Sequence, residues 1–349
     1  MDNLFCYIEK YRDINFNDKN VTEIDILIFS QIPVWRFKNL LMKYNDGIKI
    51  SYLWELSKKD IDKDAYKRTY KIMENICSAK RYKDILIKNY QYYCSNDTQF
   101  GAFTLILPNN YICVVYQGTD DTIGSWKDNF KLSYEYPTIS QNMAIEYLNR
   151  TIDSDNSKVI VCGHSKGGNL ALVSSMNMNR LKQSKIDKIY SFDGPGLRCE
   201  EFNSRKYKLI KSKLINIVPE SSCVGVILEQ ENIKFVKSNG STLMQHDPLN
   251  WCVNKDEFIV ANQSNVSKKI DLLINEMFSK LDYEERKEKF NQIYDMFDNL
   301  GISKFSDIKE KKKENIYKLI RSYKYVTKDT KILVLNILKI LVVDYVKNK

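Results

Sequence analysis

The residues best suited to do chemistry lie in the segment "VIVCGHSKGGNLA", residues 159–171, which holds a G-x-S-x-G motif around Ser165. A serine in this motif acts as a nucleophile when it sits on a sharp turn between a strand and a helix. The apolar run "KVIVC" before it and the helical pattern "GGNLALVSSMNMN" after it meet that requirement. Such a turn strains the backbone of the serine and brings the strand and the helix very close together. Residues beside the serine must therefore be small, which explains Gly163 and Gly167. We predict that Ser165 is a nucleophile, with a glycine-rich phosphate-binding or purely structural turn as the alternative.

A nucleophilic serine needs a base, and the base needs an acid that orients it. The chain has only two histidines, His164 and His246. His164 directly precedes Ser165 on the expected strand, so its side chain is expected to point away from the serine hydroxyl and to pack beside the turn. His246 lies in the turn-rich stretch "STLMQHDPLNW", after the last expected strand. By elimination, His246 is the predicted base.

Two carboxylates are candidates for the orienting acid. Asp193 ends the expected strand "KIYSF" and begins the turn "DGPG", which places its side chain on the carboxyl-end rim of the sheet. Glu220 follows the next expected strand, "KLINIVP". We favour Asp193 and keep Glu220 as the alternative, although an aspartate at such a turn can also simply cap its own backbone. Asp247, next to His246, is interpreted as a local turn former.

The oxyanion of an acyl-transfer reaction needs preorganised donors. The backbone N–H of Lys166, the residue after the nucleophile, is expected to be one of them. The side chain of Lys166 allows two interpretations. It can favour a substrate with a carboxylate or phosphate, or it can point to solvent or pair with a nearby carboxylate.

The elements that must position these residues alternate between strands and helices. "GAFTLILPNNYICVVYQGTD" predicts two strands joined by a turn at residues 108–110. "KVIVCG", "KIYSFDG", "KLINIVP" and "IKFVKSN" predict further strands, with helix-sized segments such as "ISQNMAIEYLNRTI" and "GGNLALVSSMNMNRLKQ" between them. This alternation predicts an α/β fold with a mostly parallel central sheet that is covered on both faces.

The two ends of the chain are predicted to be helical. Residues 1 to about 95 show few turn signals, and Thr22 is a candidate N-cap for an apolar helix that ends at Pro33. The aromatic segments "IPVWRF" and "YLWELS" are expected to pack in the core, with a lid or an acyl groove as the alternative.

After Pro248 the only glycine is Gly301, and the apolar spacing predicts two to four helices. We therefore expect an α/β domain over residues 1–260 and a helical C-terminal extension over residues 265–349. The apolar stretch 332–346 is expected to pack on the core, with a place at a membrane surface as the alternative.

Composition narrows the class of protein and its partners. Over 349 residues, 54 Lys and Arg stand against 44 Asp and Glu, a formal net charge of +10. Because acidic residues are interspersed and no nucleic-acid motif is present, we expect a Lys-biased solvated surface and no nucleic-acid partner, with weak peripheral membrane contact left open. The 8 scattered cysteines, with no leader pattern at the start, predict buried thiols in a reducing cytoplasm. No metal, cofactor or membrane-spanning helix is expected.

At this point the sequence resembles known proteins. "GHSKGGNLA" is similar to the nucleophile turn of α/β-hydrolases, especially the lipase-like branch with G-H-S-x-G-G. "VVYQGTDDTIGSWKDNF" resembles a strand and loop of the fungal-type (class 3) triacylglycerol lipases. With "FDGPG", "VP-x-x-S-x-V-G" and "QHDPLNW", the chain also resembles a bacterial lipase-like family without assigned function. The resemblance spans residues 20–255 and says little about residues 265–349.

The resemblance implies an α/β-hydrolase fold and hydrolysis of a carboxylic ester, with a small molecule or a lipid as substrate, through an acyl-enzyme on Ser165. It implies the chain order serine, acid, histidine, and a second oxyanion donor at Thr119 with its hydroxyl as a possible third. Gly118 would allow close approach of the backbone, and Trp126 and Asp128 would hold the oxyanion loop against the sheet.

The chain departs from the lipase pattern at two positions. Fungal-type lipases carry their acid just before the "VP" pair, where this chain has Asn216, whereas some animal lipases carry it after the earlier strand. Lipases usually have an apolar residue where this chain has Lys166. The alternatives are a phospholipase, thioesterase or acyltransferase with the same triad, and a non-catalytic hydrolase-fold scaffold that binds a partner through its C-terminal helices.

Overall fold

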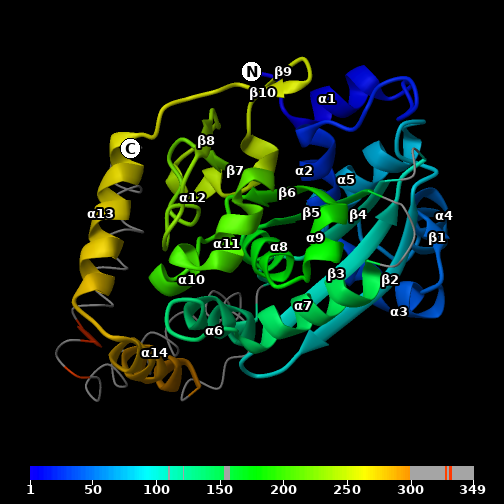
Figure 1. The fold of residues 1–349 in the computed structure, drawn as a ribbon. Coiled ribbons are helices and arrows are strands. Elements are labelled where there is room, and N and C mark those ends of the chain that lie inside the picture. Colours follow the sequence, from blue (N-terminus) through cyan, green and yellow to red (C-terminus); the bar gives the residue numbers. More distant parts are fainter. Residues whose placement is uncertain (109–110, 121, 153–157, 299–326, 328–329, 332–349) are drawn as a thin grey trace.

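An eight-stranded sheet forms the centre of the computed structural model, which describes the chain except for residues 109–110, 121, 153–157, 299–326, 328–329 and 332–349 (Figure 1). The strands lie side by side in chain order. They are β1 (Ile48–Lys49), β2 (Leu86–Cys94), β3 (Gln99–Ile106), β4 (Tyr111–Tyr116), β5 (Lys158–His164), β6 (Ile186–Phe192), β7 (Leu214–Pro219) and β8 (Ile233–Val236). Pairing is antiparallel from β1 to β4 and parallel from β4 to β8. The six strands predicted from the sequence are confirmed, and so is the mostly parallel α/β fold.

Each central strand is buried on both faces, because its side chains alternate between two hydrophobic cores. In β4, Cys113 and Val115 belong to the core beneath the N-terminal helices, whereas Val114 and Tyr116 belong to the core on the opposite face. This period of two is what a pleated strand imposes on a continuous apolar run. The run "YICVVY" therefore reads as uniformly apolar although it serves two separate cores.

The N-terminal helices cover one face of the sheet. They are α1 (Leu4–Tyr11), α2 (Glu23–Ser30), η1 (Val34–Phe37), α3 (Lys38–Lys43), α4 (Ile50–Ser57) and α5 (Lys67–Ser78). The predicted N-cap is confirmed, because the Thr22 hydroxyl accepts the backbone N–H of Asp25 in a capping box. Asp25 also accepts hydrogen bonds from the buried Arg81 guanidinium at 2.9 and 2.6 Å. This fully buried ion pair joins α2 to the segment after α5.

The helices that follow the strands cover the other face. They are α6 (Ile123–Lys131), α7 (Ile139–Thr151), α8 (Lys166–Met176), α9 (Arg180–Lys185), α10 (Cys199–Asn203) and α11 (Arg205–Ile210), with a short turn η2 (Lys211–Lys213). Beyond β8 come α12 (Thr242–Gln245), η3 (Pro248–Asn250) and a small hairpin of β9 (Val253–Asn254) and β10 (Glu257–Phe258). Because β4, β5 and β6 are parallel, their carboxyl ends lie at the same edge of the sheet. The loop that contains α12 lies next to this edge.

Two C-terminal helices pack back onto this body. Figure 1 shows α13 (Asn265–Ser279, yellow) along one side and α14 (Tyr283–Asp298, orange) close to α6. Ile270 and Ile274 of α13 pack with Val226, and Phe290 of α14 packs with Tyr134. These two helices agree with the predicted helical character, while Gly301 and residues 332–346 lie outside the described residues. The division into domains 1–260 and 265–349 stays a prediction. Within the described ranges, no helix is long and apolar enough to cross a membrane.

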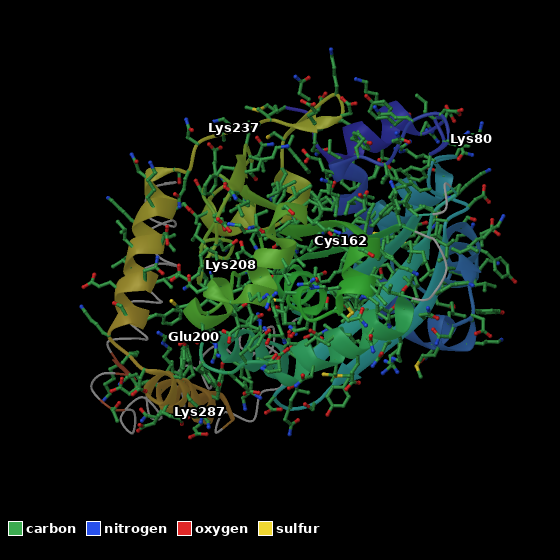
Figure 2. All side chains as sticks on the ribbon, viewed as in Figure 1. Lys80, Cys162, Glu200, Lys208, Lys237 and Lys287 are labelled. Carbon is green, nitrogen blue, oxygen red and sulfur yellow. The ribbon has the colours of Figure 1, made fainter. Side chains whose placement is uncertain are left out.

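Two expectations from the sequence are wrong. Residues 86–94, expected within a mostly helical region, form the long strand β2, which pairs with β3 across a bulge between Lys88 and Gln91. That bulge interrupts the alternation of buried and exposed residues by which a strand is recognised. The cysteines are also not all buried: Cys162 lies inside the sheet, as Figure 2 shows, but Cys94 is exposed. The other exposed thiols are those of Cys6 and Cys199.

Candidate active site

Ser165 occupies the turn between β5 and α8, in a backbone conformation that side chains rarely adopt. Its φ is +57° and its ψ is −131°, a region normally reserved for glycine. The turn is tight enough that a Cβ on Gly163 would lie 2.2 Å from the carbonyl carbon of Gly167. Only glycine allows this crossing of strand and helix, which is the backbone arrangement of a nucleophile turn.

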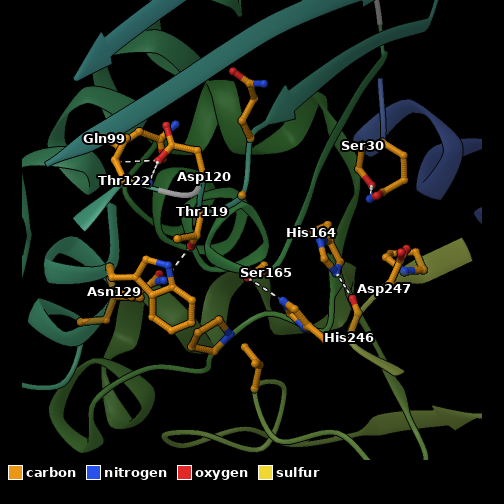
Figure 3. Close-up of a pocket in the computed structure, with 18 of the residues that line it drawn as sticks. Ser30, Gln99, Thr119, Asp120, Thr122, Asn129, His164, Ser165, His246 and Asp247 are labelled. Atoms are coloured by element: carbon orange, nitrogen blue, oxygen red, sulfur yellow. Dashed lines mark hydrogen bonds between the residues drawn. The ribbon is translucent and has the colours of Figure 1, made fainter. Parts of the chain in front are cut away.

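Ser165, His246 and Asp193 are joined by a continuous chain of hydrogen bonds. The Nε2 atom of His246 lies 3.1 Å from the Ser165 Oγ, a contact drawn in Figure 3. The Nδ1 atom of the same ring lies 2.6 Å from the Asp193 Oδ2. Ser165 and Asp193 thus lie at the ends of two adjacent parallel strands and His246 lies in the loop after β8, in the chain order serine, aspartate, histidine. This is the geometry of a Ser-His-Asp triad.

The Asp193 carboxylate is fully buried, and donors from the β7–β8 connection surround it. Its Oδ1 accepts hydrogen bonds from the Ser222 hydroxyl and from the Gly225 N–H at 3.0 Å, which leaves Oδ2 for the histidine. Such bonds stabilise an ionised carboxylate in a dry site. Ser222 and Gly225 were missed as partners, although both lie in the segment "VP-x-x-S-x-V-G". The carboxylate of Glu220 is engaged elsewhere and pairs with the Lys237 Nζ at 3.2 Å.

His164 packs beside the turn, as predicted, and contacts His246. Its Nε2 lies 2.9 Å from the carbonyl oxygen of His246, and the two rings are 4.7 Å apart. Since a carbonyl only accepts, this Nε2 carries the proton. Burial, reinforced by the neighbouring His246, holds the pKa of His164 well below its usual range, so the ring is neutral. Among the described residues, the two histidines and Asp193 are also of the kinds that bind metal ions, and their potential ligand atoms lie within 4.8 Å of one another. Each of these side chains, however, already has a hydrogen-bond partner in the protein.

The loop after β4 passes close to Ser165. A Cβ on Gly118 would lie 3.3 Å from the Ser165 Cβ, so the backbone of this loop passes close to the serine. The hydroxyl of the next residue, Thr119, accepts a hydrogen bond of 2.6 Å from the Asn129 amide of α6, as Figure 3 shows, and keeps its own proton to donate. Asn129 was not singled out from the sequence, although it lies in the segment "GSWKDNF".

The Lys166 side chain points into the protein interior and is fully buried. Its Nζ donates to the Asp128 Oδ2 at 2.8 Å, to the Gln99 Oε1 at 2.8 Å and to the Gln99 carbonyl oxygen. The interpretation that this cation favours an anionic substrate is therefore wrong, and the pairing with a nearby carboxylate is correct. As the first residue of α8, Lys166 directs its long side chain between β3 and α6. Asp128 also accepts a hydrogen bond of 3.0 Å from the Ser140 hydroxyl. Trp126, the other residue expected to hold this loop against the sheet, is partly exposed.

A cavity of about 1130 Å³ opens from Ser165 and His246. Its apolar wall comes from α6, the loop before β8 and the C-terminal helices, through residues such as Phe130, Ile227, Ile274, Phe278 and Phe290. Several residues of the N-terminal region, within 30–36 and 66–72, also line the cavity. The segment "IPVWRF" therefore contributes both to the core and to the cavity wall, and its role as a lid or an acyl groove stays a prediction.

In this segment Val34 and Phe37 are buried in the core, as expected, but Trp35 is 45% exposed and lines the cavity. The contribution of α13 and α14 to the cavity was not predicted.

The fold and the geometry of this site define a lipase-like α/β-hydrolase fold. Residues 76–295 match the model of the Mbeg1-like family, and the chain therefore belongs to that family. No curated protein sequence matches the chain.

Among solved structures, the chain is similar to three lipases at low identity. These are the Rhizomucor miehei lipase–propeptide complex (14% identity, TM-score 0.39, 62% of this chain and 68% of that one), the lipase of Rhizopus microsporus var. chinensis (16%, 0.37, 72% and 84%) and the M37 lipase (16%, 0.36, 58% and 68%).

Proposed function

We propose that the protein is a serine hydrolase that cleaves carboxylic esters through an acyl-enzyme on Ser165. The single observation that carries this proposal is the hydrogen-bonded series Ser165–His246–Asp193 on a strained strand-to-helix turn. A strained backbone is retained where the surrounding structure holds it, and such strain concentrates at functional sites. Gly163 and Gly167, which close the turn, and the donors around Asp193 together hold the geometry in place.

The proposed reaction follows from the positions of these groups. Ser165 Oγ attacks the ester carbonyl while His246 Nε2 takes the hydroxyl proton, and Asp193 stabilises the imidazolium that forms. The backbone N–H groups of Thr119 and Lys166 are proposed to stabilise the tetrahedral oxyanion. The imidazolium then protonates the departing alcohol. Water, activated by the same histidine, releases the acid and restores the serine.

The apolar wall of the cavity favours an ester with a hydrocarbon acyl chain. Ligand pockets in proteins typically measure about 300–1,000 Å³, so this cavity is large enough for a lipid-sized substrate. A phospholipase, a thioesterase and an acyltransferase would use the same groups and differ only in substrate and acceptor. The scaffold alternative is less favoured, because α13 and α14 line the cavity of the triad. We also propose a reducing cytoplasmic setting, because none of the eight cysteines, all of which the structure describes, forms a disulfide.

Hydrolysis of p-nitrophenyl esters from acetyl to palmitoyl tests the proposed activity. We expect the wild-type protein to hydrolyse at least one of them and Ser165→Ala to fall to the rate of the buffer. Ser184→Ala, a change at an exposed serine of α9, is the matched control and should retain full activity. Equal rates for Ser165→Ala and wild type would contradict the proposal.

A further inference from the structure

One cation in the wall of the cavity has no acidic partner within the described residues. Arg36 lies between two aromatic rings, with its guanidinium carbon 3.7 Å from the centre of the Trp35 ring and 3.6 Å from that of Tyr66. All three residues line the cavity that opens from Ser165. The Nε atom of Arg36 is buried and has no hydrogen-bond partner among the described residues. A buried donor without an acceptor costs free energy, so this position calls for an acceptor from elsewhere.

The other charged residues of the cavity wall already have partners. Arg68 donates to the Asp247 carboxylate and to the Gln31 Oε1 at 2.8 Å. Asp120 accepts from the Thr122 N–H at 2.9 Å and from the Tyr92 hydroxyl at 3.3 Å. Asp120 is held by neutral donors, and Arg68 is paired with a carboxylate, so Arg36 is the cation in this wall that no carboxylate among the described residues neutralises.

The stacking of Arg36 prepares it to bind an anionic group. The two ring faces hold the plane of the guanidinium, and its N–H groups remain at the edge of that plane. A guanidinium in a fixed plane matches the oxygens of phosphate or carboxylate with two parallel hydrogen bonds. Tyr66 lies two residues before Arg68, whose partner Asp247 directly follows His246. The stack is therefore connected through Arg68 to the residue that follows His246, and all of these residues line the same cavity.

We propose that the cavity takes an acyl ester with a phosphate-bearing headgroup, and that Arg36 binds the phosphate while the acyl chain lies along the apolar wall. This inference rests on the proposed function for its ester, but it assigns the headgroup independently. A carboxylate headgroup would offer a similar pair of oxygens to Arg36. The experiment below therefore compares a phosphate headgroup with a carboxylate headgroup. The residue that selects the anionic group is therefore Arg36, and Lys166, the cation next to the nucleophile, only holds the turn.

Binding in the Ser165→Ala background tests the assignment without turnover. Calorimetric titration would compare 1-decanoylglycerol 3-phosphate, 1-decanoylglycerol and the decanol monoester of succinic acid. We expect the phosphate ester to bind at least about tenfold more tightly than the neutral glyceride, the factor that one charge-assisted hydrogen bond supplies. Arg36→Gln should abolish this preference. Arg36→Lys, which keeps the charge but not the fork, should retain only part of it.

Lys49→Gln is the matched control, because it removes an exposed cation whose partner is Asp84 and which does not line the cavity. It should leave the preference unchanged. Equal affinity for the phosphate ester and the neutral glyceride would overturn the assignment, as would tightest binding of the carboxylate ester. An unchanged preference in a folded Arg36→Gln protein would do the same.

Failure of the proposed function would look different. In that case wild-type protein would not react with a fluorophosphonate, whatever the affinities of the three ligands.

Discussion

The buried pair of Lys166 and Asp128 leads to a quantitative prediction about the nucleophile turn. Both side chains are fully buried, and Nζ lies 2.8 Å from Oδ2. With an effective dielectric constant of about 20, the attraction between them is about 6 kcal/mol. Removing both charges from water costs several kcal/mol per ion, so the intact pair contributes little net stability. Removal of one partner leaves the other charge buried and unpaired, and this unpaired charge strongly destabilises the folded protein.

We therefore expect Lys166→Met to lower the free energy of unfolding by about 3–5 kcal/mol, and Asp128→Asn to do the same. The double variant should lose far less than the sum, because Met and Asn leave no buried charge and the Asn can still accept from Ser140. Urea unfolding of the four proteins in a double-mutant cycle measures this coupling directly.

The exposed pair Lys49–Asp84 supplies the control. Its double-mutant cycle should show little coupling, because solvent screens the charges. Additive losses at Lys166 and Asp128 would refute the reasoning. Such a result would mean that the pair is solvated in the folded protein.

Two further predictions concern the triad and its support. Asp193→Asn should lower kcat for ester hydrolysis by about 10³–10⁴-fold, since the base loses its orienting carboxylate, while Glu220→Gln should leave kcat near the wild-type value; the reverse pattern would transfer the role to Glu220. The lowered pKa of His164 means that the unfolded chain takes up a proton below about pH 6.5 that the folded protein does not. Stability should therefore fall with decreasing pH below that value, by at most about 1.4 kcal/mol per pH unit from this group, and His164→Gln should flatten the fall between pH 6.5 and 5 in urea unfolding. Parallel pH curves for the two proteins would contradict the assignment of a neutral His164.

The triad geometry follows from strong local signals in the sequence. The apolar run before Ser165 and the glycines around it specify a strand, a sharp turn and a helix. Two histidines leave His246 as the base by elimination, and the strand ending at Asp193 puts that carboxylate on the same rim. The structure brings these three side chains into contact, and their catalytic role remains our proposal.

Other features depend on contacts between distant segments and leave no local signal. The direction of the Lys166 side chain depends on Gln99 and Asp128, which lie on β3 and α6. The wall formed by α13 depends on the loop before β8, about 45 residues earlier, through contacts such as Ser222 with Ser267. The stack of Arg36 requires Tyr66, from beyond α4. Secondary-structure propensity and hydrophobic periodicity depend only on residues that are close in the sequence. They therefore could not predict these contacts between distant segments.

Reaction of the wild-type protein with a fluorophosphonate, followed by peptide mass mapping, tests the central claim most directly. The account predicts one adduct, located at Ser165, which is absent in Ser165→Ala and strongly reduced in His246→Ala. Folded wild-type protein that stays unlabelled, or that is labelled at a serine other than Ser165, would contradict it.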